Sequence, residues 1–127
     1  MLRREFLVVS AWLMTGGGRP FFELQPGGEM YGLIGKITAV AGKRDELIAI
    51  LVNATGEMPG CLSYIVAKDA GDADAIWVSE VWDGQSSHQA SLALPAVKEA
   101  IAKGRPLIVG FSNRVVTTPV GGVGLLR

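Results

Sequence analysis

Histidine occurs once in this chain, as His88, and the residues just before it are of types that handle protons and aromatic rings. Trp82 stands six positions upstream, and Glu80 precedes it by two. An imidazole that borders an apolar space can accept a proton near neutral pH if it reaches hydrogen-bond distance of a substrate. We therefore take His88 as the candidate proton acceptor. The alternative is a half-exposed histidine at a helix start, satisfied by Glu80 or by a backbone carbonyl.

The other candidates are aromatic and polar residues of the predicted strands and of the helix after them. Trp77 and Trp82 are an odd number of positions apart in one strand, so we expect them on opposite faces of a sheet. Asn113 and Arg114 are neighbours in the last strand, so only one of them faces the helices. An aromatic residue on a sheet face belongs more often to the core or an interface than to a substrate site. With that alternative open, the candidate substrate-binding residues are Trp77, Trp82, Tyr64, Phe111, Glu80, Ser91, Arg114 and Asn113.

The spacing of apolar residues predicts the elements that position these side chains. Leu47 and Leu51 recur at helical spacing after the first strand, and the following proline and glycine end that helix. Pro95 divides the second helical stretch, because proline lacks the N–H group that a helix interior needs. The predicted elements are, in order, a strand at 31–40, a helix at 45–58, strands at 61–68 and 75–83, helices at 86–93 and 95–103, and a strand at 107–118.

This order of elements, β-α-β-β-α-β, is that of the ferredoxin-like α+β fold, an antiparallel sheet with its helices on one face. Several strands carry apolar residues on both faces, so the uncovered face is expected to bury against the same face of a second subunit. An apolar content of 49% beside 19% charged residues favours such a homodimer interface. We expect an N-terminal extension at 1–29, the domain at 30–120 and a C-terminal tail at 121–127.

Composition excludes several other classes. Twelve basic and twelve acidic residues cancel, and no Lys/Arg cluster exceeds a pair, so we expect no nucleic-acid partner. No uninterrupted apolar run is long enough to span a membrane, for which about 18 residues are needed. Cys61 is the single cysteine, and one cysteine with one histidine cannot make an ordinary zinc site, so we expect no metal.

The first residues, MLRREFLVVSAWLMTGGG, contain a twin arginine and a short apolar run, as the start of a twin-arginine export signal does. No small-x-small cleavage site follows. We therefore expect a cytoplasmic protein, with export as the alternative. The segment can also be an upstream extension ahead of a start at Met30, or a piece that docks on the domain.

Four stretches resemble the antibiotic biosynthesis monooxygenase family, particularly its small quinol-monooxygenase-like members. They are GKRDEL at 42–47, PGCLSY at 59–64, SEVWDGQSSHQASLALPAV at 79–97 and GRPLIVGFSNRVVTTPVGG at 104–122. The resemblance covers residues 30 to about 122. It implies a dimeric α+β barrel, in which two ferredoxin-like subunits pair their sheets and each keeps a pocket between helices and sheet.

The resemblance also implies an activity without metal or flavin. Relatives oxidise phenols or quinols with molecular oxygen, because an electron-rich phenolate can itself give an electron to oxygen. The protein then supplies a base, a dry cavity and hydrogen bonds to the developing anion. The leading prediction is a cofactor-independent monooxygenase of a small aromatic quinol or phenol. The alternative is a non-catalytic dimeric module that binds an apolar small molecule.

Residue by residue, the resemblance places Glu80 and Trp82 on the family's Glu-x-Trp pattern. The family's helix histidine usually lies where this chain has Ser91, and His88 stands one turn earlier on the same face. Haem-degrading relatives use an asparagine in the first strand. None occurs between Tyr31 and Val40, so haem degradation is not expected.

Overall fold

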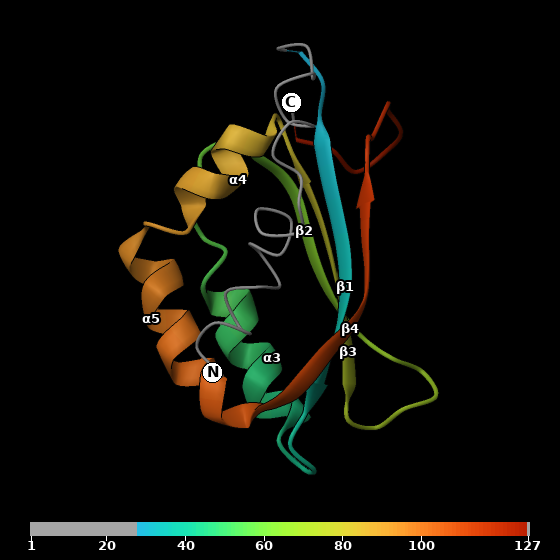
Figure 1. The fold of residues 1–127 in the computed structure, drawn as a ribbon, viewed down its shortest axis with the longest axis vertical. Helices are drawn as coiled ribbons and strands as arrows, with labels where there is room; N and C mark the ends of the chain where they lie inside the picture. The colour runs from blue at the N-terminus through green and yellow to red at the C-terminus, as the bar shows by residue number, and fades with distance from the viewer. Residues whose placement is uncertain (1–27, 127) are drawn as a thin grey trace.

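The computed structural model describes residues 28–126, in which a four-stranded antiparallel sheet carries its helices on one face (Figure 1). The strands lie in the order β2-β3-β1-β4. This confirms the ferredoxin-like α+β prediction. The expected extension at 1–29 lies, up to residue 27, outside the described residues. The elements are β1 (Tyr31–Ala39), α3 (Arg44–Asn53), β2 (Cys61–Lys68), β3 (Ala75–Trp82), α4 (Gln85–Ser91), α5 (Pro95–Gly104), the short 3-10 helix η1 (Arg105–Leu107) and β4 (Ile108–Thr117).

Helix α3 ends at Asn53, so the prediction that it runs to Met58 was wrong at this end. The N–H of Thr55 bonds to the carbonyl of Val52, three residues back, and its hydroxyl donates to the same oxygen at 2.8 Å. A side chain that bonds the backbone in this way competes with continued helix. Met58 thereby leaves the helix and packs against a cluster of buried residues at the start of β1 and the end of β3.

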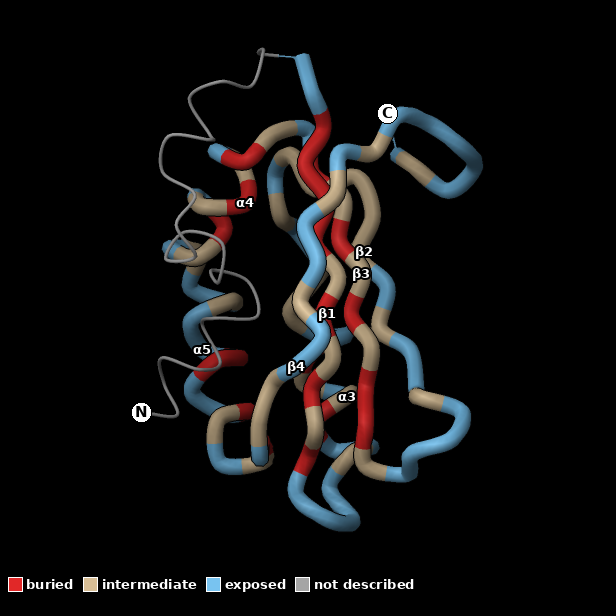
Figure 2. Tube along the Cα trace, turned by 45° about the vertical axis from the view of Figure 1, so that its right-hand side comes forward, coloured by how far each residue is buried: buried red, intermediate tan, exposed pale blue. Residues whose placement is uncertain are grey.

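Strand β3 separates its side chains between two faces, as the alternation predicted. Ile76, Val78, Glu80 and Trp82 are buried beneath the helices, whereas Trp77, Ser79 and Val81 are only half-buried on the opposite face. Figure 2 shows the buried positions recurring along β1 and β3, the two central strands. The register pairs Tyr31 with Trp82 and Leu33 with Glu80, so these four side chains share the helix-covered face.

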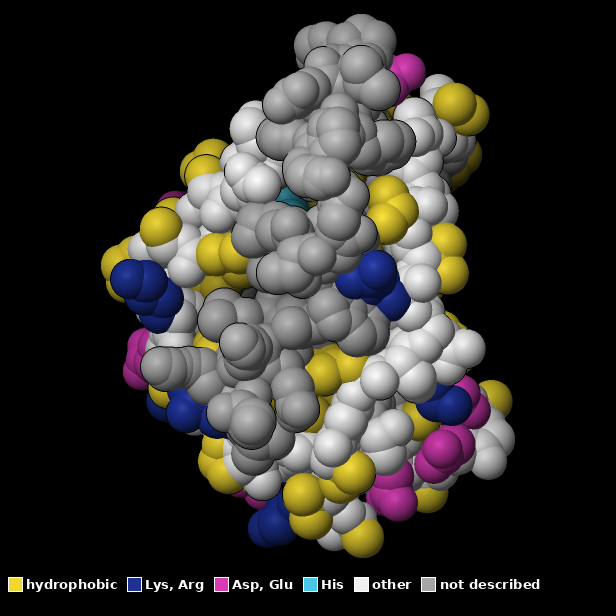
Figure 3. Space-filling model, viewed as in Figure 1, with side chains coloured by type: hydrophobic (Ala, Val, Ile, Leu, Met, Phe, Trp, Pro, Cys, Tyr) yellow, Lys and Arg dark blue, Asp and Glu magenta, His cyan; other side chains and the backbone are white. Residues whose placement is uncertain are grey.

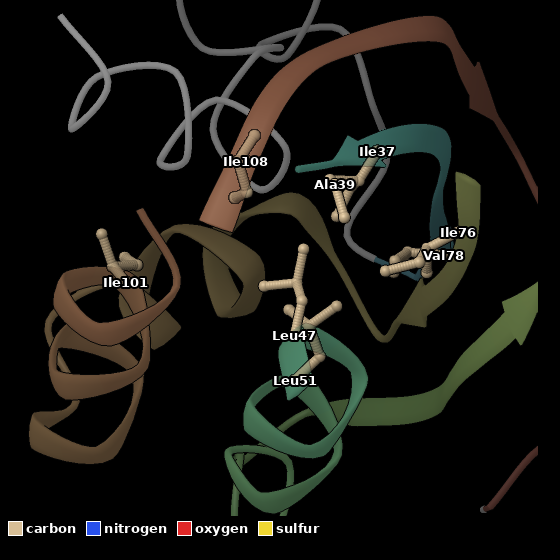
Figure 4. Close-up of a cluster of buried hydrophobic side chains, with 8 residues drawn as sticks. All are labelled: Ile37, Ala39, Leu47, Leu51, Ile76, Val78, Ile101 and Ile108. Carbon is tan, nitrogen blue, oxygen red and sulfur yellow. The ribbon is translucent and has the colours of Figure 1, made fainter. Parts of the chain in front are cut away.

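The core divides into two parts. The larger part fills the space between the sheet, α3 and α5, and Figure 4 shows its side chains converging from these elements. The smaller part comprises Tyr31, Leu33 and Trp82, with Met58 and Cys61 against it. The buried polar side chains of Glu80 and His88 lie beside the smaller part. The larger part consists of Ile37, Ala39, Leu47, Leu51, Ile76, Val78, Ile101 and Ile108.

The chain after β4 crosses the end of its own sheet. The N–H of Leu126 donates to the carbonyl of Leu62 at 3.0 Å, which joins the C-terminal segment to β2, the strand at the far edge from β4. Pro119 lies over Gly32 in β1 on the open face, where a side chain would collide with Thr117 and Pro119. The segment therefore closes one end of the open sheet face.

Charges of both signs are mixed on the face of the molecule seen in Figure 3, and apolar side chains lie between them. Within residues 28–126, no helix is both long enough and apolar enough to cross a membrane.

Candidate functional site

His88 is fully buried in α4, where its ring lies between two aromatic side chains. The ring centroid of Tyr31, from β1, is 5.4 Å away, and that of Trp82, from β3, is 5.5 Å away with its plane nearly perpendicular. His88 therefore faces the sheet. The alternative of a half-exposed histidine at a helix start does not describe this side chain.

Glu80 lies beside this histidine in the same buried space, at 2% exposure. Its Oε1 accepts a hydrogen bond from Trp82 Nε1 at 2.9 Å and stands 3.9 Å from His88 Nε2. The second distance is too long for a hydrogen bond. On the helix, the Ser91 hydroxyl donates to the His88 backbone carbonyl at 2.6 Å, so Ser91 fixes the backbone here rather than the imidazole.

Several polar atoms around His88 are buried and have no hydrogen-bond partner among the described residues. They are Glu80 Oε2 and both ring nitrogens of His88, together with Tyr31 Oη and Gln85 Oε1, which lack full hydrogen-bond geometry although Gln85 is close enough to lower the pKa of Tyr31. A buried polar atom without a partner costs about 1–3 kcal/mol, so natural folds rarely gather several in one place. Such a concentration marks these side chains as a candidate site for a polar ligand group.

Burial moves the two titratable groups in opposite directions, because it disfavours the charged form of each. Desolvation raises the pKa of Glu80 to about 8, against a smaller lowering by the Trp82 hydrogen bond. Desolvation lowers the pKa of His88 to about 4. Near pH 7 the carboxyl is therefore protonated and the imidazole neutral, so the two side chains do not form an ion pair. The imidazole is in the form that can accept a proton.

The neighbouring titratable groups are also held neutral. Burial raises the pKa of the Tyr31 hydroxyl and Glu80 raises it further, while Arg114 lowers it by a smaller amount. Burial likewise raises the pKa of the Tyr64 hydroxyl, and it raises the pKa of Cys61 to about 11. The Cys61 thiol is thus not a thiolate at neutral pH.

Two hollows lie next to each other beneath the helices. The inner cavity, of about 30 Å³, is bounded by Tyr64, Glu80, Trp82 and Ser91 and by apolar residues of α3 and α5. The outer hollow, of about 220 Å³, lies at the β2 edge and reaches Leu126 of the C-terminal segment. Thr55, Met58 and Tyr64 line both. His88 lines neither, although its neighbour Glu80 lines the inner cavity.

Of the residues predicted from sequence, the structure brings together five: His88, Glu80, Trp82, Ser91 and Tyr64. The other four lie elsewhere. Phe111 sits opposite Ile37 and packs against the larger core. Arg114 is half-buried and is close enough to Tyr31 to influence its pKa.

Asn113 is exposed, with a positive φ of 53°, at an irregularity of β4. Trp77 lies on the open face of the sheet, where its Nε1 donates to Asp69 Oδ2 at 2.7 Å and Lys36 Nζ stands 5.7 Å from the ring centroid. Because that face points away from the helices, Trp77 does not reach the inner cavity.

Sequence reasoning missed Tyr31 and Gln85. Tyr31 was read only as the start of a strand, and its place in the site follows from its pairing with Trp82. Gln85 lies three positions before His88, a spacing that puts both on one side of a helix. The helical signal was present in the sequence. The strand pairing that brings Tyr31 to Trp82 was not.

Within residues 28–126, no group of three or more His, Cys, Asp or Glu side chains is arranged to hold a metal ion. The donor atoms near His88 are one carboxyl, one imidazole, one amide and one phenol. These are groups that bind a hydroxyl or carbonyl by hydrogen bonds.

With fold and site described, the chain can be placed among known proteins. The family model for antibiotic biosynthesis monooxygenase matches residues 30–103, and the chain belongs to this family. This confirms the resemblance drawn from the sequence. No curated protein matches the chain.

A crystal structure from Chloroflexus aurantiacus J-10-fl, provisionally named an antibiotic biosynthesis monooxygenase, is 60% identical. The match covers 76% of this chain and 98% of that one, with a TM-score of 0.74. The chain is thus similar over nearly the whole length of that relative.

Two further structures are similar in fold alone. One, from Caulobacter crescentus CB15, carries the same provisional family name; it is 17% identical over 80% of this chain and 96% of that one, with a TM-score of 0.64. The other is a mutant of SnoaB, a cofactor-independent oxygenase from Streptomyces nogalater. It is 13% identical over 74% of this chain and 96% of that one, with a TM-score of 0.62.

Proposed function

We propose that this protein is a cofactor-independent monooxygenase that oxidises a small aromatic quinol or phenol with molecular oxygen. The observation that carries the proposal is His88, a fully buried and neutral imidazole with no hydrogen-bond partner at either ring nitrogen. It stands beside a carboxyl that lines a cavity. Family membership supports the reaction class, and the name of SnoaB is one precedent for it on this fold.

In the proposed reaction, His88 is the final acceptor of the substrate's phenolic proton. The resulting phenolate is electron-rich and transfers an electron to oxygen, after which a carbon–oxygen bond forms on the ring. One oxygen atom stays on the oxidised ring and the other leaves as water, which takes up two hydrogens from the substrate. Burial by itself disfavours the anion, so the fixed polar groups of the site have to stabilise the phenolate.

The inner cavity alone does not hold an aromatic ring. About 15 Å³ of such space accommodates one water molecule, so about 30 Å³ holds one or two. A single ring fits only if the inner cavity joins the outer hollow. The side chain of Met58 lies at their shared boundary, and methionine repacks easily because it is unbranched and flexible. The proposal therefore favours a substrate with one ring over a polycyclic one.

An oxygen-uptake assay over a panel of one-ring and fused-ring quinols tests the proposal. The wild type is expected to consume oxygen with a one-ring quinol, and His88→Ala to lose about 100-fold or more of that rate. Val52→Ala, at an exposed position of α3, serves as the control and should keep the rate. Equal rates in wild type and His88→Ala would remove His88 from the chemistry.

The apolar lining of the inner cavity favours a second candidate, a non-catalytic module that binds an apolar small molecule. Most of its walls are aliphatic residues such as Leu51, Val97 and Ile101. Thermal stabilisation by quinols without oxygen consumption would support this candidate over the monooxygenase.

We further propose that the open sheet face forms a homodimer. Ile65, Ser79, Ile34 and Val115 are paired across the four strands in one row on this face. Ile65 is 57% exposed and Val115 is 49% exposed. A self-complementary apolar row of this kind suits a two-fold contact. Because the C-terminal segment covers only one end of the face, the centre of the row remains available.

Analytical ultracentrifugation of Ile65→Lys tests the dimer. A lysine in this apolar row is expected to convert the wild-type dimer to a monomer at micromolar concentration. Val52→Lys is the matched control, since Val52 is 51% exposed on α3, away from the sheet face. A monomeric wild type, or an Ile65→Lys variant that stays dimeric, would contradict this interface.

A further inference from the structure

The inner cavity is lined by Glu80 and not by His88. We propose that Glu80 is the residue that contacts the substrate hydroxyl and carries its proton to His88. This inference rests on the proposed function, in which His88 is the final proton acceptor. It adds a catalytic role for Glu80 that a direct contact between substrate and histidine does not require.

The direction from which a substrate arrives favours Glu80. The outer hollow at the β2 edge shares Thr55, Met58 and Tyr64 with the inner cavity, and the inner cavity ends at Glu80, Trp82 and Ser91. A molecule that passes Met58 therefore reaches the carboxyl. Neither of these two hollows has His88 in its walls, and the Tyr31 and Trp82 rings lie against the imidazole.

The two oxygens of Glu80 have different surroundings. Oε1 accepts the Trp82 N–H and is the oxygen 3.9 Å from His88 Nε2. Oε2 is buried without a partner. Trp82 thus holds the carboxyl by the oxygen nearer the imidazole, and the second oxygen is available to a hydroxyl in the cavity.

The groups that face Glu80 come from each neighbouring element. Tyr31 lies on β1, Tyr64 and Cys61 on β2, and His88 on α4; Arg114 of β4 acts on Tyr31. Glu80 itself raises the pKa of Tyr31, Tyr64 and Cys61. Since these three stay neutral and no basic side chain is among the causes acting on Glu80, the carboxyl is protonated and can pass a proton on.

The transfer balances as a double proton shift. The substrate O–H bond breaks and an O–H bond forms at Glu80 Oε2, while the carboxyl proton leaves Oε1 and an N–H bond forms at His88 Nε2. The carboxyl is again neutral, with its proton now on Oε2, and the imidazole has gained one proton for the one that the substrate lost. The Oε1–Nε2 separation must shorten by about 1 Å for this step, as catalytic hydrogen bonds often do when a substrate binds.

The test uses para-nitrophenol, whose phenolate absorbs visible light, bound anaerobically to the full chain at a pH just below the pKa of the free phenol. Burial lowers the pKa of His88 to about 4, but a phenolate formed nearby favours the protonated imidazole, so the wild type is expected to ionise the bound probe. Glu80→Gln keeps an acceptor for the Trp82 N–H but cannot carry a proton, so it should bind the probe and slow its ionisation, followed by stopped-flow absorbance, by about tenfold or more. His88→Gln should do the same, and Val52→Ala should match the wild type.

Each outcome decides the proposal. Unchanged ionisation in Glu80→Gln would mean that the phenol meets His88 directly, and unchanged ionisation in His88→Gln would mean that the proton goes elsewhere; either result overturns the relay. A wild type that leaves the bound probe neutral overturns it too. Ionisation that follows the expected pattern in a protein that consumes no oxygen with any quinol supports the relay while refuting the monooxygenase.

Discussion

Two tryptophan–carboxylate pairs lie on opposite faces of this sheet and show what burial does to the same chemistry. On the covered face, Trp82 Nε1 donates to Glu80 at 2.9 Å; on the open face, Trp77 Nε1 donates to Asp69 at 2.7 Å. Desolvation outweighs the hydrogen bond at Glu80 and raises its pKa to about 8. At solvent-accessible Asp69 the hydrogen bonds dominate and lower the pKa.

The difference separates a reactive pair from a structural one. The Asp69 carboxylate is ionised near neutral pH, bonds the Trp77 indole and a turn N–H, and so fixes the β2–β3 connection. The Glu80 carboxyl is neutral there and retains an oxygen without a partner. Because a group whose pKa lies near the working pH can both take and give a proton, the covered pair is the one suited to catalysis.

The largest expected contrast is in stability. Trp82→Ala should lower the free energy of unfolding by about 3–5 kcal/mol, since a fully buried ring leaves a cavity that the core cannot refill. Trp77→Ala, at a half-buried site, should lower it by about 1 kcal/mol. Urea unfolding followed by circular dichroism measures both, in the Ile65→Lys background so that no partner subunit covers Trp77. Equal losses would contradict the difference in burial between the two faces.

Replacing His88 should expose the titration of Glu80. Because folding raises the pKa of Glu80, its contribution to the free energy of unfolding is fully present below the unfolded pKa of 4.5. That contribution is lost as the pH rises toward about 8. Folding lowers the pKa of His88, so its contribution has the opposite pH dependence. It is fully present above the unfolded pKa of 6.5 and is lost as the pH falls toward about 4. Between pH 4.5 and 6.5 the two effects cancel, so wild-type stability should be flat there.

In His88→Gln the cancellation ends. Its free energy of unfolding should fall with rising pH across the same window by up to about 1.4 kcal/mol per pH unit. Chemical denaturation at half-unit pH steps measures this slope. A variant as flat as the wild type would mean that the two buried groups do not titrate in opposite senses.

Most of the fold could be predicted from local sequence patterns, because the spacing of apolar residues and prolines within about a dozen positions determines each helix and strand. The period-two alternation of β3 and the proline at 95 gave the strand faces and the break between α4 and α5. The end of α3 was wrong, because the Thr55 hydroxyl and backbone close the last turn in a way that apolar spacing does not reveal.

The site was only partly predictable for a similar reason. Alternation placed the two tryptophans on different faces, but which face the helices cover depends on packing across the whole domain. Tyr31 joins Trp82 and His88 through strand register, a pairing between residues about fifty positions apart. The unpaired oxygen of Glu80 depends on where every neighbour lies, so no spacing rule would have found it.

The smallest expected effect is a difference between Glu80 and Asp69 in how each makes stability depend on pH. Wild-type stability should fall between pH 6.5 and 8, where Glu80 still contributes and His88 no longer does, again by up to about 1.4 kcal/mol per pH unit. Glu80→Gln should abolish that fall, because the amide stays neutral in both folded and unfolded chains. Asp69→Asn should keep it, since the lowered Asp69 pKa adds stability only above its unfolded value and loses it as the solution becomes acidic. Thermal unfolding of the three proteins across this range distinguishes them, and a fall that survives in Glu80→Gln would assign the titration to another group.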